Sequence, residues 1–117
     1  MVDNPLCKIR TIYRAIGEFE DRLVRDYGLC LNEGMVLCFI SEKGTASSSE
    51  IASALDLTCS NASKVIKSVE SKQLIQRSLD ETDKRMMLFS LTKEGKQKLK
   101  ELMACDVGPL SQLNELF

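Results

Sequence analysis

Apolar residues recur every three or four positions near the start of the chain, which is the spacing of one helix face. The repeat consists of Leu6, Ile9, Tyr13, Ile16, Leu23, Val24 and Tyr27. Asn4 followed by Pro5 is typical of a helix start, and Gly28 is typical of a helix end. The pattern predicts an amphipathic helix of about six turns over residues 5–27.

The next segment is apolar on most of its sides. Its apolar residues are Met35, Val36, Leu37, Phe39 and Ile40. Asn32 is a preferred N-cap residue and Gly44 is a preferred stop, so we expect a buried helix from about Glu33 to Lys43.

Two short helices with polar caps are predicted after it. Ser47 and Glu50 have the spacing of a capping box, and Thr58 can cap a second helix after a break at residues 56–57. The inward stripe of that second helix is Ala62, Val65, Ile66 and Val69. Two short helices joined by a tight turn are typical of a helix-turn-helix, expected here over about residues 47–72.

Alternating residues then predict a β-hairpin over about residues 74–91. Its strands are expected at 74–79 and 85–91, on either side of a polar turn. A hairpin directly after a helix-turn-helix is a wing. Thr92 caps a last helix, and the chain continues with apolar residues at helical spacing: Leu110, Leu113, Leu116 and Phe117.

These elements predict a mainly α fold with a small β-hairpin (α+β), a winged helix-turn-helix. We expect a single domain over residues 1–117, with dimerisation helices at about 5–27 and 92–117. No apolar run approaches the roughly 20 residues that span a bilayer, and residues 1–10 lack a signal sequence. We therefore expect a cytoplasmic protein without membrane contacts.

Positive charge is concentrated in one part of the chain. The net charge is −1, but residues 58–100 carry ten basic and five acidic side chains. Local clustering matters more for DNA binding than the total, so the helix-turn-helix and wing are the candidate nucleic-acid surface.

The composition argues against an enzyme and against a metal site. The chain has no histidine, and its five cysteines are widely spaced: Cys7, Cys30, Cys38, Cys59 and Cys105. It therefore lacks the commonest general base and any pattern of zinc ligands, and we expect neither catalysis nor a cofactor. The thiols are expected to be small buried hydrophobes.

One segment has the spacing of a known family motif. It runs Asp80-Glu81-Thr82-Asp83-Lys84-Arg85 and, after a strand, ends in Leu91-Thr92-Lys93-Glu94-Gly95. With Ser49 to Ala52 and Leu74 to Arg77, it resembles the MarR family of bacterial regulators, over roughly residues 6–103. Two positions depart from the family pattern. Gln73 stands where glycine is usual, so that turn is expected to be built differently, and Cys59 stands where proline is usual.

The exposed face of the second short helix carries the expected DNA contacts. Its side chains are Ser60, Asn61, Ser63, Lys64 and Lys67. Asn can pair with adenine through two hydrogen bonds, Lys can reach guanine or phosphate, and Ser permits close approach. The alternative is a solvated helix face.

The resemblance implies that Arg85 on the wing enters the minor groove, held by Asp83. An arginine suits a narrow groove with negative potential. The alternative is a structural Asp83–Arg85 pair that only shapes the hairpin. Lys72 and Lys84 are expected to contact phosphate.

The family resemblance implies a sequence-specific transcriptional regulator, a repressor that binds pseudo-palindromic double-stranded DNA as a homodimer. In the family, a small molecule or an oxidant often alters the dimer and releases DNA. The alternative is a winged helix used only for protein contacts, which needs no basic cluster. Salt dependence separates the two, because phosphate contacts release counterions.

Cys7 is a candidate redox residue. It lies in the first turn of the first predicted helix, where amide groups and the nearby Lys8 and Arg10 can stabilise a thiolate. Some oxidant-sensing members of the family have a reactive cysteine near that end of the helix. An inert, buried thiol is the alternative for Cys7.

Overall fold

The computed structural model describes residues 4–105 of the chain. The described residues divide into two compact units, one that includes residues 4–30 and Cys105 and another made of Leu31–Ala104. Along the described residues, no helix is long and apolar enough to cross a bilayer. The predicted tail helix with Leu110 and Phe117 lies outside the described residues.

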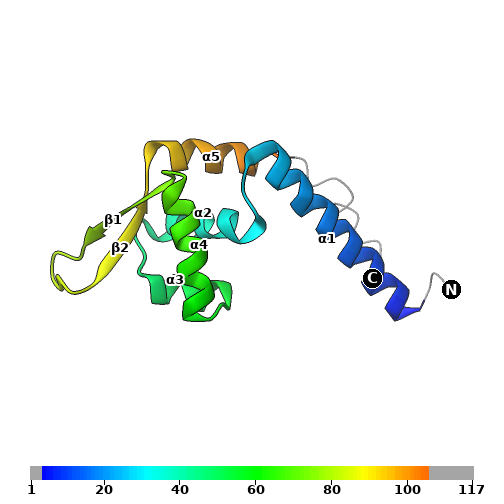
Figure 1. Cartoon of the computed structure of the whole chain (residues 1–117), viewed down its shortest axis with the longest axis horizontal. Helices are drawn as coiled ribbons and strands as arrows, with labels where there is room; N and C mark the ends of the chain where they lie inside the picture. The colour runs from blue at the N-terminus through cyan, green and yellow to red at the C-terminus, as the bar shows by residue number, and fades with distance from the viewer. Residues whose placement is uncertain (1–3, 106–117) are drawn as a thin grey trace. The chain divides into compact units, whose positions relative to one another are not determined.

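The first unit contains the long helix α1 (Pro5–Tyr27; Figure 1). Asn4 caps its start by accepting a hydrogen bond from the Cys7 amide at 2.8 Å. Gly28 ends it with φ +72° and donates to the Val24 carbonyl. Both ends are as the sequence predicts, because the cap residues satisfy amides and carbonyls that a helix end leaves unpaired.

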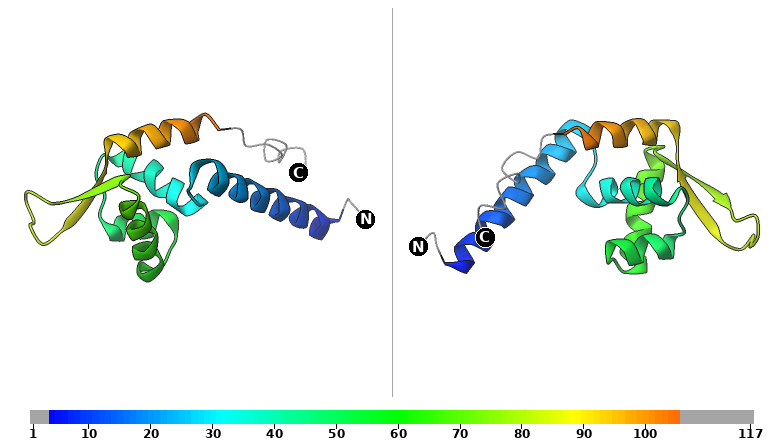
Figure 2. Two further views of the ribbon diagram at one scale, coloured as in Figure 1. Left: turned by 45° about the horizontal axis from the view of Figure 1, so that its top comes forward. Right: turned by 180° about the vertical axis from the view of Figure 1, so that it is seen from behind.

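The second unit contains the remaining elements, in the order of a winged helix. They are α2 (Leu31–Lys43), α3 (Ser48–Leu55), α4 (Cys59–Ser71), β1 (Ile75–Leu79), β2 (Met87–Leu91) and α5 (Lys93–Met103). Helix α2 contacts α3, α4, α5 and β2, so it lies at the centre of the unit. The hairpin extends away from these helices in every view (Figures 1 and 2). The predicted mainly α fold with a wing is confirmed.

The core of this unit comes from the apolar stripes of its helices and from the base of the hairpin. Fully buried residues include Val36, Leu37, Ile40, Ala46, Ile51 and Val69. The stripe predicted for α4 is inward, with Ala62, Ile66 and Val69 buried. Burial of these side chains is the main force that holds the helices together.

The predicted start of α2 is wrong by two residues. The helix begins at Leu31, so Asn32 lies inside its first turn and does not cap it. A cap contributes about 1 kcal/mol, which is too little to fix a helix start when buried residues downstream set the helix position.

The wing is an antiparallel hairpin in which Ile75 pairs with Leu91 and Leu79 pairs with Met87. A third short segment joins it, because Ala46 and Phe89 exchange backbone hydrogen bonds of 3.0 and 2.8 Å. A single residue cannot show the alternation of apolar and polar positions that marks a strand. The sequence pattern therefore did not predict this bridge. This bridge ties the start of the helix-turn-helix to the wing.

The turn after α4 keeps the left-handed conformation although it lacks glycine. Gln73 has φ +63°, so the expectation that this turn is built differently is wrong. The Thr92 hydroxyl donates to the Gln73 carbonyl at 2.7 Å, and the Thr92 amide donates to the Leu74 carbonyl at 3.0 Å. These bonds hold a conformation that is unfavourable for a residue with a Cβ.

Candidate nucleic-acid interface

The exposed face of α4 carries the side chains that the sequence predicts for DNA contact. Thr58 caps the helix by accepting a hydrogen bond from the Asn61 amide at 3.1 Å. The exposed residues are Ser60, Asn61, Ser63, Lys64 and Lys67. The buried stripe lies opposite them, so these side chains are free to meet a base edge or a phosphate.

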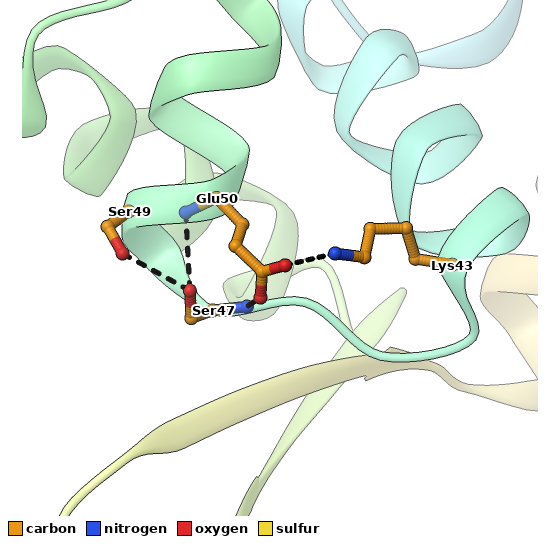
Figure 3. Close-up of polar contacts among 4 residues, drawn as sticks. All are labelled: Lys43, Ser47, Ser49 and Glu50. Atoms are coloured by element: carbon orange, nitrogen blue, oxygen red, sulfur yellow. Dashed lines mark hydrogen bonds and ion pairs between the residues drawn. The ribbon is translucent and has the colours of Figure 1, made fainter.

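Helix α3 packs against α4 and is fixed by its own N-terminal contacts (Figure 3). The Ser47 hydroxyl accepts from the Glu50 amide at 3.2 Å, and the Glu50 carboxylate accepts from the Ser47 amide at 3.0 Å. Lys43, at the end of α2, pairs with the same carboxylate. The Lys43 ammonium and then the Ser47 amide lower the pKa of Glu50 to about 2. The predicted capping box is present.

The wing turn is built by two aspartates. Asp80 accepts from both the amide and the hydroxyl of Thr82 at 3.0 Å. Asp83 accepts from the Arg85 amide at 3.1 Å and from its Nε at 3.3 Å. The Arg85 side chain is 93% exposed. Asp83 therefore orients Arg85 without covering it, and Lys84 beside it is also exposed.

Lys72 has a partner that the sequence did not indicate. Its ammonium donates to Glu33 Oε2 at 2.7 Å, and the Ser68 hydroxyl donates to the same oxygen at 2.7 Å. Only 7% of the Glu33 side chain is exposed. A signal was available, because Glu33 is the first position of the buried stripe completed by Val36, Leu37 and Ile40.

A second ion pair joins α4 to the wing. Arg77 donates from two nitrogens to the two carboxylate oxygens of Glu70, both at 2.6 Å. Its guanidinium lies 5.7 Å from the centre of the Phe89 ring. The paired guanidinium holds the pKa of Glu70 below its ordinary value. This bidentate geometry couples the end of the candidate recognition helix to β1.

The five cysteines are free thiols with different exposures. Cys59 is exposed at the first position of α4, and none of the five is fully buried, so the expectation of buried thiols is wrong. The other four are half-buried, and burial raises the pKa of Cys38. Cys7 lines an open groove on α1 with Leu6, Ile9 and Tyr13, and its redox role stays a prediction. Within residues 4–105, no cluster of three potential metal ligands is present.

Comparison with known proteins identifies transcriptional regulators among the relatives of this chain. The family model described as MarR family matches residues 29–87. An uncharacterized HTH-type transcriptional regulator, YwaE of Bacillus subtilis (strain 168), is 29% identical over 93 residues, which is 80% of this chain and 54% of that protein. The chain spans about half the length of the curated relatives it matches.

Solved structures share the fold. The transcriptional regulator BldR of Sulfolobus solfataricus superposes with a TM-score of 0.71 at 29% identity, covering 92% of this chain and 84% of that one. A MepR–DNA complex of S. aureus superposes with a TM-score of 0.69 at 21% identity, covering 92% and 86%. The named relatives are regulators and not enzymes, in agreement with the sequence. The chain belongs to the MarR family.

Proposed function

We propose that this chain is a transcriptional regulator that binds double-stranded DNA through α4 and the wing. Two observations carry the proposal: the face of α4 opposite its buried stripe is exposed and polar, and the wing has an arginine that Asp83 orients but leaves 93% exposed. A helix of this kind fits the major groove, and an exposed arginine on a wing fits the minor groove. The MepR–DNA complex, a structure of the same fold, supports it.

The side chains divide into base contacts and phosphate contacts. Asn61 can pair with adenine through two hydrogen bonds, and Lys64 can reach guanine or a phosphate. Ser60 and Ser63 are short and permit a close approach to the groove. Lys67 and Lys84 are proposed to contact phosphates, which fixes position and adds affinity without reading sequence. Lys72 differs, because its ammonium is paired with Glu33.

We also propose that the chain acts as a homodimeric repressor. The long helix α1 exposes large apolar side chains, including Leu6, Ile9 and Tyr13, which a second copy can cover. A two-fold dimer presents two copies of α4 to a pseudo-palindromic site, with half-sites about one helical turn apart. A small molecule or an oxidant is the proposed signal for release from DNA.

Substitution of the two proposed base-reading elements tests this function. Operators are first selected from random DNA with the unaltered chain. Asn61→Ala should lose discrimination at one or two base positions, at a cost of roughly 1–3 kcal/mol. Arg85→Ala should weaken binding most where the flanks are A·T-rich, because narrow grooves attract arginine. Affinities are measured by fluorescence anisotropy on a set of operator variants.

Asn32→Ala, a change of the same kind at an exposed position of α2, is the matched control. It should alter neither the discrimination between bases nor the affinity for operators with A·T-rich flanks. Equal losses across all sequences for both Asn61→Ala and Arg85→Ala would mean that these residues do not read bases. Binding that is insensitive to salt would instead favour a winged helix used for protein contacts.

A further inference from the structure

A buried carboxylate lies between the central helix α2 and the proposed recognition helix α4. Among residues 4–105, Glu33 is the only charged residue that is buried. One of its oxygens accepts hydrogen bonds from Ser68 and from Lys72, each at 2.7 Å. Both donors belong to the C-terminal half of α4 or directly follow it. Glu33 therefore ties that half of α4 to the core of the unit.

Stability alone does not account for a carboxylate at this place. Burying a charge is costly even when it is paired, and a well-packed apolar residue of similar size often stabilises a core as well or better. What the carboxylate adds is direction, because a hydrogen bond depends on angle as well as distance, whereas an apolar contact depends far less on angle. Such groups are used elsewhere to specify one geometry among several.

The contacts of α4 lie on both sides of its buried stripe. At 3.6 residues per turn, Asn61, Ser68 and Lys72 lie within about 40° of one another around the helix axis. Glu70 lies on the opposite side of the stripe, where it holds Arg77 of the wing. The apolar stripe determines which face is inward, and the two polar ties restrict rotation about the axis. Asn61 shares the side that Glu33 holds.

We propose that Glu33 is a positioning residue for DNA reading. It sets the rotation of α4 at which Asn61 meets a base, and it holds Lys72 in an ion pair, so that Lys72 is a structural residue and not a phosphate contact. The proposal rests on the proposed function, because it concerns the accuracy of a DNA-reading helix. In this proposal, Glu33 does not contact DNA but determines sequence specificity through the orientation of α4.

The first test measures the ratio of affinities for a selected operator and for a scrambled duplex of the same length. Glu33→Ala and Ser68→Ala should each lower this ratio, by about tenfold for Glu33→Ala, while affinity for the scrambled duplex stays within about twofold. Glu33→Gln, which keeps an acceptor for Ser68, should recover part of the ratio. Glu42→Ala, a change at an exposed glutamate of the same helix, is the control.

The two duplexes separate positioning from damage to the fold. A partly unfolded variant loses affinity for both duplexes by the same factor, and that result for Glu33→Ala and Ser68→Ala would overturn the proposal. Ser68→Ala leaves the Lys72–Glu33 pair in place, so it stays informative if Glu33→Ala does not fold. Circular dichroism confirms that each variant is folded at the assay temperature.

The second test measures the salt dependence of binding. Lys72→Met should leave the slope of log affinity against log salt unchanged, because the pair with Glu33 already occupies this ammonium. Lys67→Met on the exposed face should reduce the slope by about one. A reduction of about one for Lys72→Met, with equal weakening on all sequences, would make Lys72 a phosphate contact and overturn the proposal.

Failure of this inference differs from failure of the proposed function. If the unaltered chain selects no sequence from random DNA, both are wrong. If it selects an operator and the Glu33 and Ser68 variants behave like Glu42→Ala, the proposed function stands and Glu33 has no positioning role.

Discussion

Gly95 lies at a position where the backbone of another segment leaves no room for a side chain. A Cβ built at this position would overlap the backbone carbonyl of Leu74, which cannot move aside as a side chain could. Its amide also donates to the Thr92 hydroxyl at 2.9 Å, which caps α5. The family motif of Leu91, Thr92 and Gly95 therefore describes a cap and a close approach of α5 to the base of the wing.

We predict that Gly95→Ala lowers the free energy of unfolding by about 1–3 kcal/mol, the usual cost of overpacking. Urea denaturation should show a lower midpoint with an unchanged slope. Gly34→Ala is the control, because its Cβ would lie 3.6 Å from Leu102 Cδ1, an ordinary contact. That change should be neutral or stabilising by up to about 1 kcal/mol, since alanine favours a helix. Equal effects of the two changes would contradict this account.

At the scale of single residues, local rules identify most of the helix caps, although Asn32 does not cap α2 as predicted. The cap residues Asn4, Ser47, Thr58 and Thr92 were all identified, because a cap needs only a polar side chain and a free amide nearby. Glu33 was not identified. The buried stripe of α2 could have shown that Glu33 faces the core, but its partners lie 35 and 39 residues further along the chain and could not be identified from local spacing.

At the scale of elements, the hydrophobic pattern predicted the order of helices and strands but not how α4 is held. Periodicity reports which face is buried, and the predicted inward stripe of α4 is buried. The tie from Glu70 to Arg77 and the bridge from Ala46 to Phe89 depend on packing between distant elements. The exposed residues of α4 could be named from sequence because their exposure follows from the position of that stripe.

Helix α3 provides a pH-dependent test of these element contacts. The pKa of Glu50 is about 2 in the folded chain, below its ordinary value of 4.5, chiefly because of Lys43 and then Ser47. Because this pKa is lowered, the Glu50 charge contributes its full share of folding stability above about pH 4.5. This stability is lost as the pH falls towards 2. Glu50→Gln keeps an acceptor for the capping box but removes the charge.

We therefore predict that the unaltered chain and Glu50→Gln differ in free energy of unfolding at pH 6. The two free energies should converge between about pH 4.5 and pH 2. Urea denaturation at a series of pH values measures the difference. Glu42→Gln, the same change at an exposed glutamate of α2, is the matched control for the loss of a glutamate charge. A difference between the unaltered chain and Glu50→Gln that stays constant across this range would contradict the assignment of the contribution to the Glu50 charge.

At the scale of the whole molecule, assembly is the property that a single chain leaves open. Helix α1 has buried Ala15 and Leu23 on one side and exposed Leu6, Ile9 and Tyr13 on another. The last two of these are 57% and 80% exposed. A soluble monomer rarely exposes such a continuous apolar row, and a stable interface must bury about 1,200–2,000 Å² in total.

We predict a two-fold dimer in which α1 is covered by the partner, and Tyr13→Asp should disrupt it. A charge placed in an apolar interface is costly because it has no partner there. Light scattering at micromolar concentration should give the mass of a dimer for the unaltered chain and of a monomer for Tyr13→Asp. Thr11→Asp introduces the same charge at an exposed position on the other side of α1 and should leave the dimer intact.

Tyr13→Asp should also bind a full palindrome no more tightly than a half-site, since its two copies of α4 are no longer linked. A monomeric unaltered chain, or equal loss of the dimer in both variants, would show that α1 does not form the interface.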